Sequence, residues 1–327
     1  MHAIRQYEFG PADRLRYEEV PDPVPHAGQA RIRVAAAGVH LVDTSIRAGV
    51  TGGPFPPPEL PMTPGREVAG VVDVVGSEVD SQWVGARVVA HLGPASGGYA
   101  ELAVANVTSL QRVPDGVGDA AAVATIGTGR TAMAVLNDAA VTADDVVLVT
   151  AAAGGIGSVA VQVARNAGAT VIGLAGGPAK VEVVRALGAH IALDYEDPGW
   201  VDRLTAELGE RRLSVVLDGV GGKPGRAAMD LLGPGGRLVM FGWSAGEPTE
   251  LSAPDLFGRG LTVSVPIGQR IMAVPGRLRA LEDQALAEVA AGRVEPLVNE
   301  PFALADAAAA HVALETRATV GKVVLIP

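Results

Sequence analysis

The first 124 residues alternate apolar and polar positions in short runs that proline and glycine separate. The clearest runs are QARIRVAAAG from residue 29, REVAGVVDVVG from residue 66 and GYAELAVAN from residue 98. A period of two between closely spaced turn residues is typical of antiparallel strands. We therefore expect residues 1–124 to form an antiparallel β domain.

The pattern changes at Val146, where short β-branched runs begin to alternate with helical signals. Successive runs start 20 to 24 residues apart, and proline and glycine between them stand where helices begin and end. Six strands that alternate with helices predict a doubly wound parallel sheet. The six runs are VVLVT from residue 146, TVIGL from 170, HIAL from 190, LSVVL from 213, RLVMF from 237 and LTVSV from 261.

The C-terminal part contains two more helical segments and a last apolar strand. Residues 275–291 and 304–314 have helical patterns, and the chain closes with GKVVLIP. We expect this closing strand to return to the first domain. A chain of 327 residues usually holds more than one core. We therefore expect a discontinuous domain over 1–124 and 267–327, and an inserted domain over 125–266.

A cluster of glycines follows the first strand of the parallel pattern. The stretch AAGGIG over residues 152–157 matches G-x-G-x-x-G with alanine in the first glycine position. Gly154 lets a diphosphate approach the backbone, and Gly157 lets the following helix pack closely on its strand. The amides at the start of that helix then face the phosphates. In this context the motif predicts a dinucleotide site, with a tight turn that binds no ligand as the alternative.

The residues after the second parallel strand favour NADPH over NADH. Sites of this type that bind NAD place an acid about 20 residues after the glycines, bonded to the ribose. The corresponding stretch, GLAGGPAK from residue 173, has no carboxylate and ends on Lys180. Lys180, with Arg185, could neutralise a 2′-phosphate. The alternative is that both are solvated charges on a helix.

Composition narrows the classes of function. A formal net charge of −10 without any basic run argues against nucleic-acid binding. The chain has no cysteine, which excludes disulfides, thiolate ligands of zinc and a cysteine nucleophile. The uncharged residues 146–164 approach the length of a membrane span, but their glycines stand where a strand turns into a helix. No signal-peptide pattern opens the sequence, so we expect a cytoplasmic protein with no membrane association.

Four segments carry a resemblance to a known family. PGREVAGVVDVVG from residue 64 is similar to P-G-x-E-x-x-G, and GGYAELAVAN from residue 97 to G-x-Y-A-E. AAAGGIGSVAVQVARNAGA from residue 151 and GRLVMFGWSAG from residue 236 resemble a nucleotide loop and a nicotinamide-side loop. The whole chain thus resembles the medium-chain dehydrogenase/reductase superfamily, in its zinc-free quinone oxidoreductase (zeta-crystallin-like) branch. This implies an α/β protein with an N-terminal GroES-like β-barrel domain and a six-stranded Rossmann domain.

The resemblance implies a set of residues that bind NADPH. Phosphate, adenosine and nicotinamide contacts are expected at Ala153, Gly154, Gly155, Ile156, Gly157, Lys180, Tyr195, Val220, Phe241, Gly242 and Ser244. Within this set the glycine turn would meet the diphosphate, while Lys180 and Tyr195 would hold the 2′-phosphate.

The resemblance also places His40, Ser45 and Thr131 near the substrate. His40 stands where relatives have asparagine, and Ser45 where they often have tyrosine. His40 could donate a hydrogen bond or a proton to the acceptor oxygen, or it could be a packed histidine. Thr131 could lie near the nicotinamide or bond the backbone of its own helix.

Four further polar residues have structural interpretations. We expect Tyr99 to be a core aromatic rather than a proton donor. We expect Arg130 to pair with a nearby acid rather than with an anionic substrate, and Arg47 and Arg66 to form ion pairs.

No metal is expected. In zinc-dependent relatives the position of His40 is a cysteine ligand, and the position of Arg66 is a histidine ligand. A guanidinium does not bind zinc, and a structural zinc site usually needs four thiolates. His40 and Glu67 could be imagined as only a partial site.

These observations predict a zinc-independent, NADPH-dependent oxidoreductase that transfers hydride to a quinone or a similar electrophilic conjugated acceptor. The first alternative is an enoyl or 2-alkenal reductase of the same fold. A second is an NADPH-binding protein without significant turnover, and a third is a zinc alcohol dehydrogenase. The resemblance implies a homodimer that pairs edge strands of the Rossmann sheet.

Overall fold

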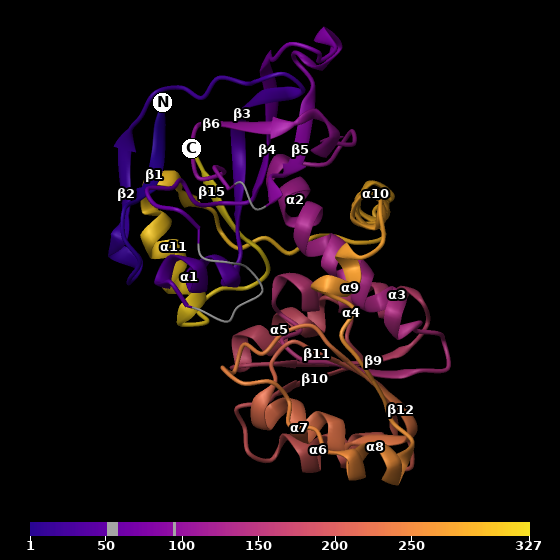
Figure 1. Ribbon diagram of the computed structural model, residues 1–327. Coiled ribbons are helices and arrows are strands. Elements are labelled where there is room, and N and C mark those ends of the chain that lie inside the picture. Colours follow the sequence, from indigo (N-terminus) through magenta and orange to yellow (C-terminus); the bar gives the residue numbers. More distant parts are fainter. Residues whose placement is uncertain (51–57, 94–95) are drawn as a thin grey trace. The chain divides into compact units, whose positions relative to one another are not determined.

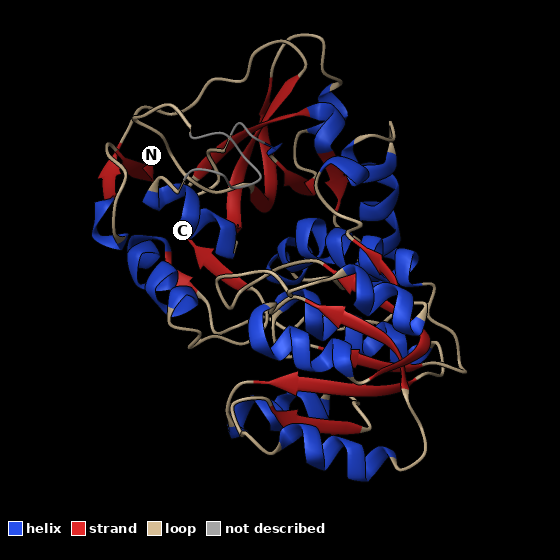
Figure 2. Cartoon of the chain, turned by 60° about the horizontal axis from the view of Figure 1, so that its bottom comes forward, coloured by secondary structure: helices blue, strands red, loops and turns tan. Residues whose placement is uncertain are grey.

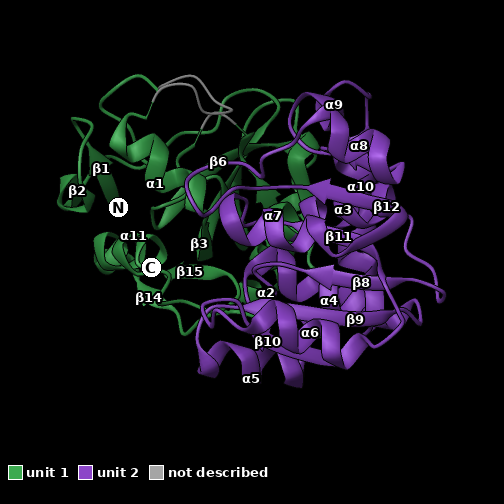
Figure 3. Cartoon of the chain, turned by 90° about the horizontal axis from the view of Figure 1, so that it is seen from below, with its two compact units in different colours: residues 1–128, 296–327 green, residues 129–295 purple. Residues whose placement is uncertain are grey.

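The computed structural model describes residues 1–50, 58–93 and 96–327, which form two compact units (Figure 3). Unit 1 comprises Met1–Thr128 and Pro296–Pro327, and unit 2 comprises Gly129–Glu295. The chain passes from unit 1 to unit 2 within a π-helical stretch, Thr125–Gly129.

Unit 2 is built on a six-stranded parallel sheet. Its strands are β8 (Val146–Val149), β9 (Thr170–Ala175), β10 (Ile191–Asp194), β11 (Leu213–Asp218), β12 (Leu232–Met240) and β13 (Thr262–Ser264). The spatial order is β10-β9-β8-β11-β12-β13, and every pairing is parallel. The order reverses between β8 and β11, which is the topological switch point where doubly wound sheets bind ligands. The six predicted strands are therefore confirmed.

Helices cover both faces of this sheet (Figure 2). Val147 and Val149 of β8 belong to one apolar cluster, while Leu148 between them belongs to the other, as the period of two requires. The first cluster includes side chains of α3, α4 and α10, and the second includes side chains of α6 and α7. The helices are α3 (Arg130–Ala139), α4 (Gly155–Asn166), α5 (Pro178–Ala186), α6 (Trp200–Leu208), α7 (Gly222–Asp230), α8 (Ala253–Arg259), α9 (Gln269–Met272) and α10 (Arg277–Ala290).

Unit 1 is a mainly antiparallel β structure. Its larger sheet has the order β14-β15-β3-β4-β5-β7, with β6 paired to β3, while β1 and β2 form a separate pair (Figure 1). The strands are β1 (His2–Gln6), β2 (Leu15–Glu19), β3 (Gln29–Val39), β4 (Glu67–Val75), β5 (Arg87–His91), β6 (Leu102–Asn106), β7 (Leu110–Arg112), β14 (Phe302–Ala303) and β15 (Val323–Ile326). The closing strand β15 pairs antiparallel with β3, so the C-terminus returns to this unit as predicted.

Short helices complete unit 1. They are α1 (Leu41–Ala48), α2 (Asp119–Ala124) and α11 (Ala307–Glu315), with 3-10 turns at Ala12–Arg14, Ser81–Trp83, Val107–Ser109 and Leu304–Asp306. Helix α1 ends at Gly49, whose φ of 74° is the left-handed conformation that glycine adopts without strain.

The second domain boundary lies later than the sequence indicated. Residues 267–295 were expected in the first domain, but the structure places them in unit 2. Helix α10 packs on α3, where Arg130 pairs with Glu282 at 2.9 Å. Gln162 of α4 bonds both the backbone N–H and the carbonyl of Glu295, each at 2.9 Å. These contacts join the segment to the Rossmann helices until the chain leaves at Pro296.

Candidate active site

The glycine turn between β8 and α4 is closely fitted to its own backbone. Gly154 caps α4, and the first backbone bond of the helix runs from the N–H of Ser158 to Gly154 O at 2.9 Å. The N–H groups of residues 155–157 precede that bond and so have no partner within the helix. A Cβ built on Gly157 would lie only 2.2 Å from Ala151 O. The turn therefore needs glycine here, and it offers amides to an anion at the switch point.

A buried aspartate organises the ends of β11 and β12. Asp218 is fully buried and accepts hydrogen bonds from Thr150 Oγ1 at 2.8 Å and Thr249 Oγ1 at 2.6 Å. It also accepts the backbone N–H groups of Val220 and Gly221, at 3.0 and 3.1 Å. This network ties the loop after β11 to Thr150 and Thr249.

The loop after β12 packs against the loop after β11. The Phe241 N–H donates to Asp218 O at 2.8 Å, and the Ser244 N–H donates to Gly219 O at 3.2 Å. A Cβ built on Gly242 would lie 3.0 Å from Gly219 O. The structure thus brings together four predicted cofactor residues, Val220, Phe241, Gly242 and Ser244. The sequence analysis missed Asp218, although a polar residue at the end of an apolar strand is a signal that would have found it.

The third group of predicted cofactor residues lies at the ends of β9 and β10. Lys180 is in the first turn of α5, and Tyr195 directly follows β10. A Cβ built on Gly176 would lie 3.0 Å from Tyr195 Oη, so the phenol lies against the turn that leads into α5. Arg185 is at the other end of α5, where it pairs with Glu182 and donates to Ala192 O. Of the two predicted cations, only Lys180 lies at this edge of the sheet.

Unit 1 contains a compact cluster of three ionisable side chains. Glu67 Oε2 lies 2.9 Å from His40 Nε2 and 2.7 Å from Lys322 Nζ, and the two nitrogens are 3.0 Å apart. Glu67 and Lys322 are buried, whereas the His40 side chain is 23% exposed. His40 is therefore the member of the cluster through which solvent or a ligand can reach it.

The backbone around Glu67 is fitted to its carboxylate. A Cβ built on Gly127 would lie 1.8 Å from Glu67 Oε1, and one built on Gly38 would lie 2.4 Å from Oε2. Burial by itself would raise the pKa of Glu67, but the charges of His40 and Lys322 and the hydrogen bond from His40 lower it well below its usual range. Glu67 is therefore a permanent anion that holds the two nitrogens together.

A second buried polar chain supports the helix that carries His40. Arg47 Nη1 lies 3.3 Å from His311 Nδ1, and His311 Nε2 lies 3.2 Å from Tyr99 Oη. Tyr99 donates to Asp43 Oδ2 at 3.2 Å, and Asp43 Oδ2 accepts the backbone N–H of His40 at 2.9 Å. Because Arg47 can only donate, Nδ1 of His311 accepts, and its Nε2–H donates to Tyr99. The bonds from Arg47 through His311 and Tyr99 thus all run towards Asp43, which also accepts from the backbone of His40.

This arrangement changes two pKa values. Burial lowers the pKa of His311 to about 4, against the opposing charge of Asp43 and with a smaller contribution from Arg47. Burial, followed by the charge and hydrogen bond of Asp43, raises the pKa of Tyr99 well above its usual value. Tyr99 is a buried core residue, which agrees with its structural interpretation.

The other predicted substrate residues, Ser45 and Thr131, lie on helices of different units, and the three predicted structural arginines form ion pairs. Ser45 lies on α1 in unit 1, and Thr131 is the second residue of α3 in unit 2. Arg130 pairs with Glu282, Arg47 with Glu315 at 2.6 Å, and Arg66 with Asp43 at 3.7 Å, as expected for structural roles.

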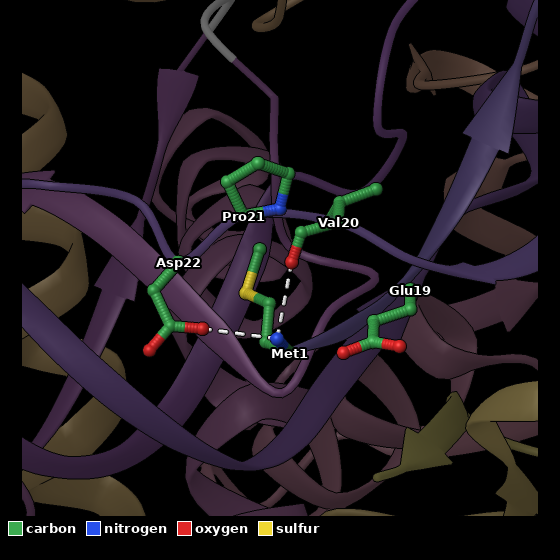
Figure 4. Close-up of a pocket in the computed structure, with 5 residues that line it drawn as sticks. All are labelled: Met1, Glu19, Val20, Pro21 and Asp22. Atoms are coloured by element: carbon green, nitrogen blue, oxygen red, sulfur yellow. Dashed lines mark hydrogen bonds and ion pairs between the residues drawn. The ribbon is translucent and has the colours of Figure 1, made fainter.

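An open pocket of about 460 Å³ lies elsewhere in unit 1 (Figure 4). It is lined by residues 19–22 and Met1, whose ammonium donates to Val20 O at 3.1 Å and Asp22 Oδ1 at 2.9 Å. None of its lining residues belongs to the predicted site. The hydrogen bonds in this pocket are those of the Met1 ammonium.

Comparisons with known proteins agree with this geometry. Residues 26–115 match the family described as the alcohol dehydrogenase GroES-like domain, and residues 155–283 match the family of zinc-binding dehydrogenases. A quinone oxidoreductase of Pseudomonas aeruginosa is 33% identical over 98% of this chain and 97% of its own. A 2-haloacrylate reductase of a Burkholderia species is 33% identical over 100% and 99%. The crystal structure of Escherichia coli quinone oxidoreductase complexed with NADPH covers 100% of both chains at 30% identity, with a TM-score of 0.89.

The β domain, the Rossmann sheet and the glycine turn at its switch point define a medium-chain dehydrogenase/reductase, and the chain belongs to that superfamily. Full-length similarity places it in the quinone oxidoreductase branch, a group of oxidoreductases. Among the residues that the structure describes, no helix combines the length and apolar character that a bilayer crossing needs.

The residues of unit 1 do not fit a catalytic zinc. The whole sequence has no cysteine. Within residues 1–50, 58–93 and 96–327, no three His, Cys, Asp or Glu side chains gather as ligands. The Lys322 ammonium contacts both His40 and Glu67, the two residues that could have formed a partial site. A fixed cation at this point opposes a divalent metal.

Proposed function

We propose that this chain is a zinc-independent oxidoreductase that uses NADPH to reduce a quinone or a similarly electrophilic conjugated acceptor. The observation that carries the proposal is the glycine turn at the switch point of a parallel sheet with the Rossmann order. The similarity to quinone oxidoreductases over the full length supports the choice of acceptor.

The residues of unit 2 fit a dinucleotide. The amides of Gly155, Ile156 and Gly157, with Ala153 and Gly154 before them, would hold the diphosphate, because Gly154, Gly155 and Gly157 place no side chain between the backbone and a ligand. Val220, Phe241, Gly242 and Ser244 would line the adenosine and nicotinamide ends of the site. Lys180 and Tyr195 would meet the 2′-phosphate.

NADPH, when bound, supplies a hydride, which reduces the acceptor by two electrons and leaves one oxygen of the acceptor in need of a proton. A quinone accepts hydride without a Lewis acid, so the protein mainly provides proximity and a polar lining. His40 is the residue of the unit 1 cluster that can reach an acceptor. We assign His40 the role of giving the acceptor oxygen its proton, while Glu67 and Lys322 hold the ring at Nε2.

The same cluster favours the alternative of a C=C reductase. Reduction of a conjugated alkene produces an enolate, which must be protonated before the product can leave. A proton from His40 would serve that step, and the similarity to a 2-haloacrylate reductase supports it. A 2-alkenal or a 2-haloacrylate is therefore the second substrate class to test.

A steady-state assay distinguishes these functions. NADPH oxidation would be followed with 1,4-benzoquinone, with 2-hexenal and with 2-chloroacrylate, using enzyme treated with a chelator. Turnover with benzoquinone that survives chelation supports the main proposal, and turnover with the alkenes alone supports the second. Binding of NADPH without oxidation by any acceptor would leave only a coenzyme-binding protein, and both proposals would fail.

We also propose a cytoplasmic homodimer. Strand β13 stands at one edge of the Rossmann sheet, and Val265 directly after it is 45% exposed. An edge strand has unpaired backbone groups that a second copy can pair. Sedimentation velocity gives the oligomeric state, and a monomer at micromolar concentration would contradict the dimer.

A further inference from the structure

The fold brings a carboxylate to the end of β9, where the sequence has none. In doubly wound sites, an acid at the end of the second strand binds the ribose hydroxyls. Here Gly176 and Gly177 stand after β9. A Cβ built on Gly176 would lie 2.8 Å from Glu196 Oε1 and 3.0 Å from Tyr195 Oη. The carboxylate of Glu196, which follows β10, therefore lies over the position that usually bears the acid.

Hydrogen bonds join the turn after β9 to the loop after β10. Asp194 Oδ1 accepts the backbone N–H of Gly177 at 3.0 Å and that of Glu196 at 2.9 Å. The Tyr195 N–H donates to Ala175 O at 3.1 Å. Strands β9 and β10 are neighbours in the parallel sheet (Figure 3). The backbone of Glu196 is thus held beside the turn into α5.

A carboxylate here has opposite effects on the two coenzymes. It can accept hydrogen bonds from the 2′- and 3′-hydroxyls of NADH, and it repels the doubly charged 2′-phosphate of NADPH. Lys180, in the first turn of α5, acts in the reverse sense. The site therefore contains charged groups that act in opposite senses on the two coenzymes.

We propose that Glu196 is a specificity-determining residue that admits NADH to this enzyme beside NADPH. The proposal rests on the proposed function, because it requires a nicotinamide coenzyme on unit 2. The proposal adds a residue from the loop after β10 to a coenzyme selection that is usually made at the end of the second strand.

The test compares the dissociation constants of NADPH and NADH for the full chain and for Glu196→Gln, by fluorescence titration without any acceptor. We expect the wild-type chain to bind the two coenzymes within about tenfold of each other. The variant should bind NADPH about tenfold more tightly, equivalent to about 1.4 kcal/mol, and NADH several-fold more weakly. Competition by adenosine 2′,5′-bisphosphate and by AMP should show the same opposite changes in affinity. These two probes carry the adenosine ribose with and without the 2′-phosphate, and neither has the nicotinamide.

Glu182→Gln is the matched control. Glu182 is an exposed carboxylate on α5 that pairs with Arg185, and its removal makes the same change in net charge. We expect this control to leave the ratio of the two constants unchanged. If Glu196→Gln leaves the ratio within twofold of the wild type, or if Glu182→Gln shifts it equally, the proposal is overturned although NADPH still binds. Failure of the wild-type chain to bind either coenzyme would instead refute the proposed function.

Discussion

Protonation of His311 should make unit 1 sensitive to mild acid. The imidazole is fully buried, accepts from Arg47 at Nδ1 and donates to Tyr99 at Nε2. A proton on Nδ1 would remove that acceptor and place two cations side by side. Burial, which is the largest cause, and the charge of Arg47 lower the pKa of His311 to about 4.

The sign and size of the effect follow from linkage. In the unfolded chain the ring titrates near its ordinary pKa of about 6.5. Between pH 6.5 and pH 4 the unfolded state binds a proton that the folded state does not, so acid favours unfolding. The stabilisation is fully present above pH 6.5 and is lost as the pH falls towards 4. Between pH 7 and pH 4.5 the free energy of unfolding should fall by about 2.5 kcal/mol from this group alone.

The assay is urea unfolding at pH 7 and at pH 4.5, for the wild type and for His311→Gln. Glutamine does not titrate, so the variant is less stable at pH 7 but should lose about 2.5 kcal/mol less over this interval. The difference between the two proteins cancels the contribution of other groups. An NMR titration of the His311 ring in the wild-type protein gives the pKa directly. A pKa near 6.5, or equal losses in both proteins, would refute the reasoning.

Two further pairs of substitutions test a close backbone contact and a buried ion pair. Gly157→Ala puts a methyl group 2.2 Å from Ala151 O, so thermal unfolding should show a loss of about 1–3 kcal/mol and NADPH titration a weaker affinity. Gly258→Ala, with open space around its Cβ, should be neutral or stabilising, and equal effects of the two would contradict the argument. Glu67→Gln leaves the buried Lys322 ammonium without its anion and should lower the free energy of unfolding by about 3–5 kcal/mol. In a double-mutant cycle measured by urea unfolding, Lys322→Met should recover part of that loss, and strictly additive effects would show that the ion pair is not coupled.

Much of the fold could be predicted from the sequence because its signals are local. The six β-branched runs became β8 to β13, since strand periodicity and turn residues act over a few neighbours. The segment 267–295 could not be assigned in the same way. Its helix α10 has an ordinary helical pattern, and the unit to which the segment belongs is decided by partners more than a hundred residues earlier, such as Arg130 and Gln162.

In the candidate site, too, one part could be predicted from the sequence and another part depends on the tertiary structure. The turn at Gly154–Gly157 was determined by the sequence itself, because the backbone at Gly157 lies so close to Ala151 O that it tolerates no side chain. The contacts of His40 with Lys322, and the carboxylate of Glu196 over Gly176, were decided only by the tertiary structure. Charges interact through space, and strand pairing sets which distant charges meet, so no local pattern in the sequence records these neighbours.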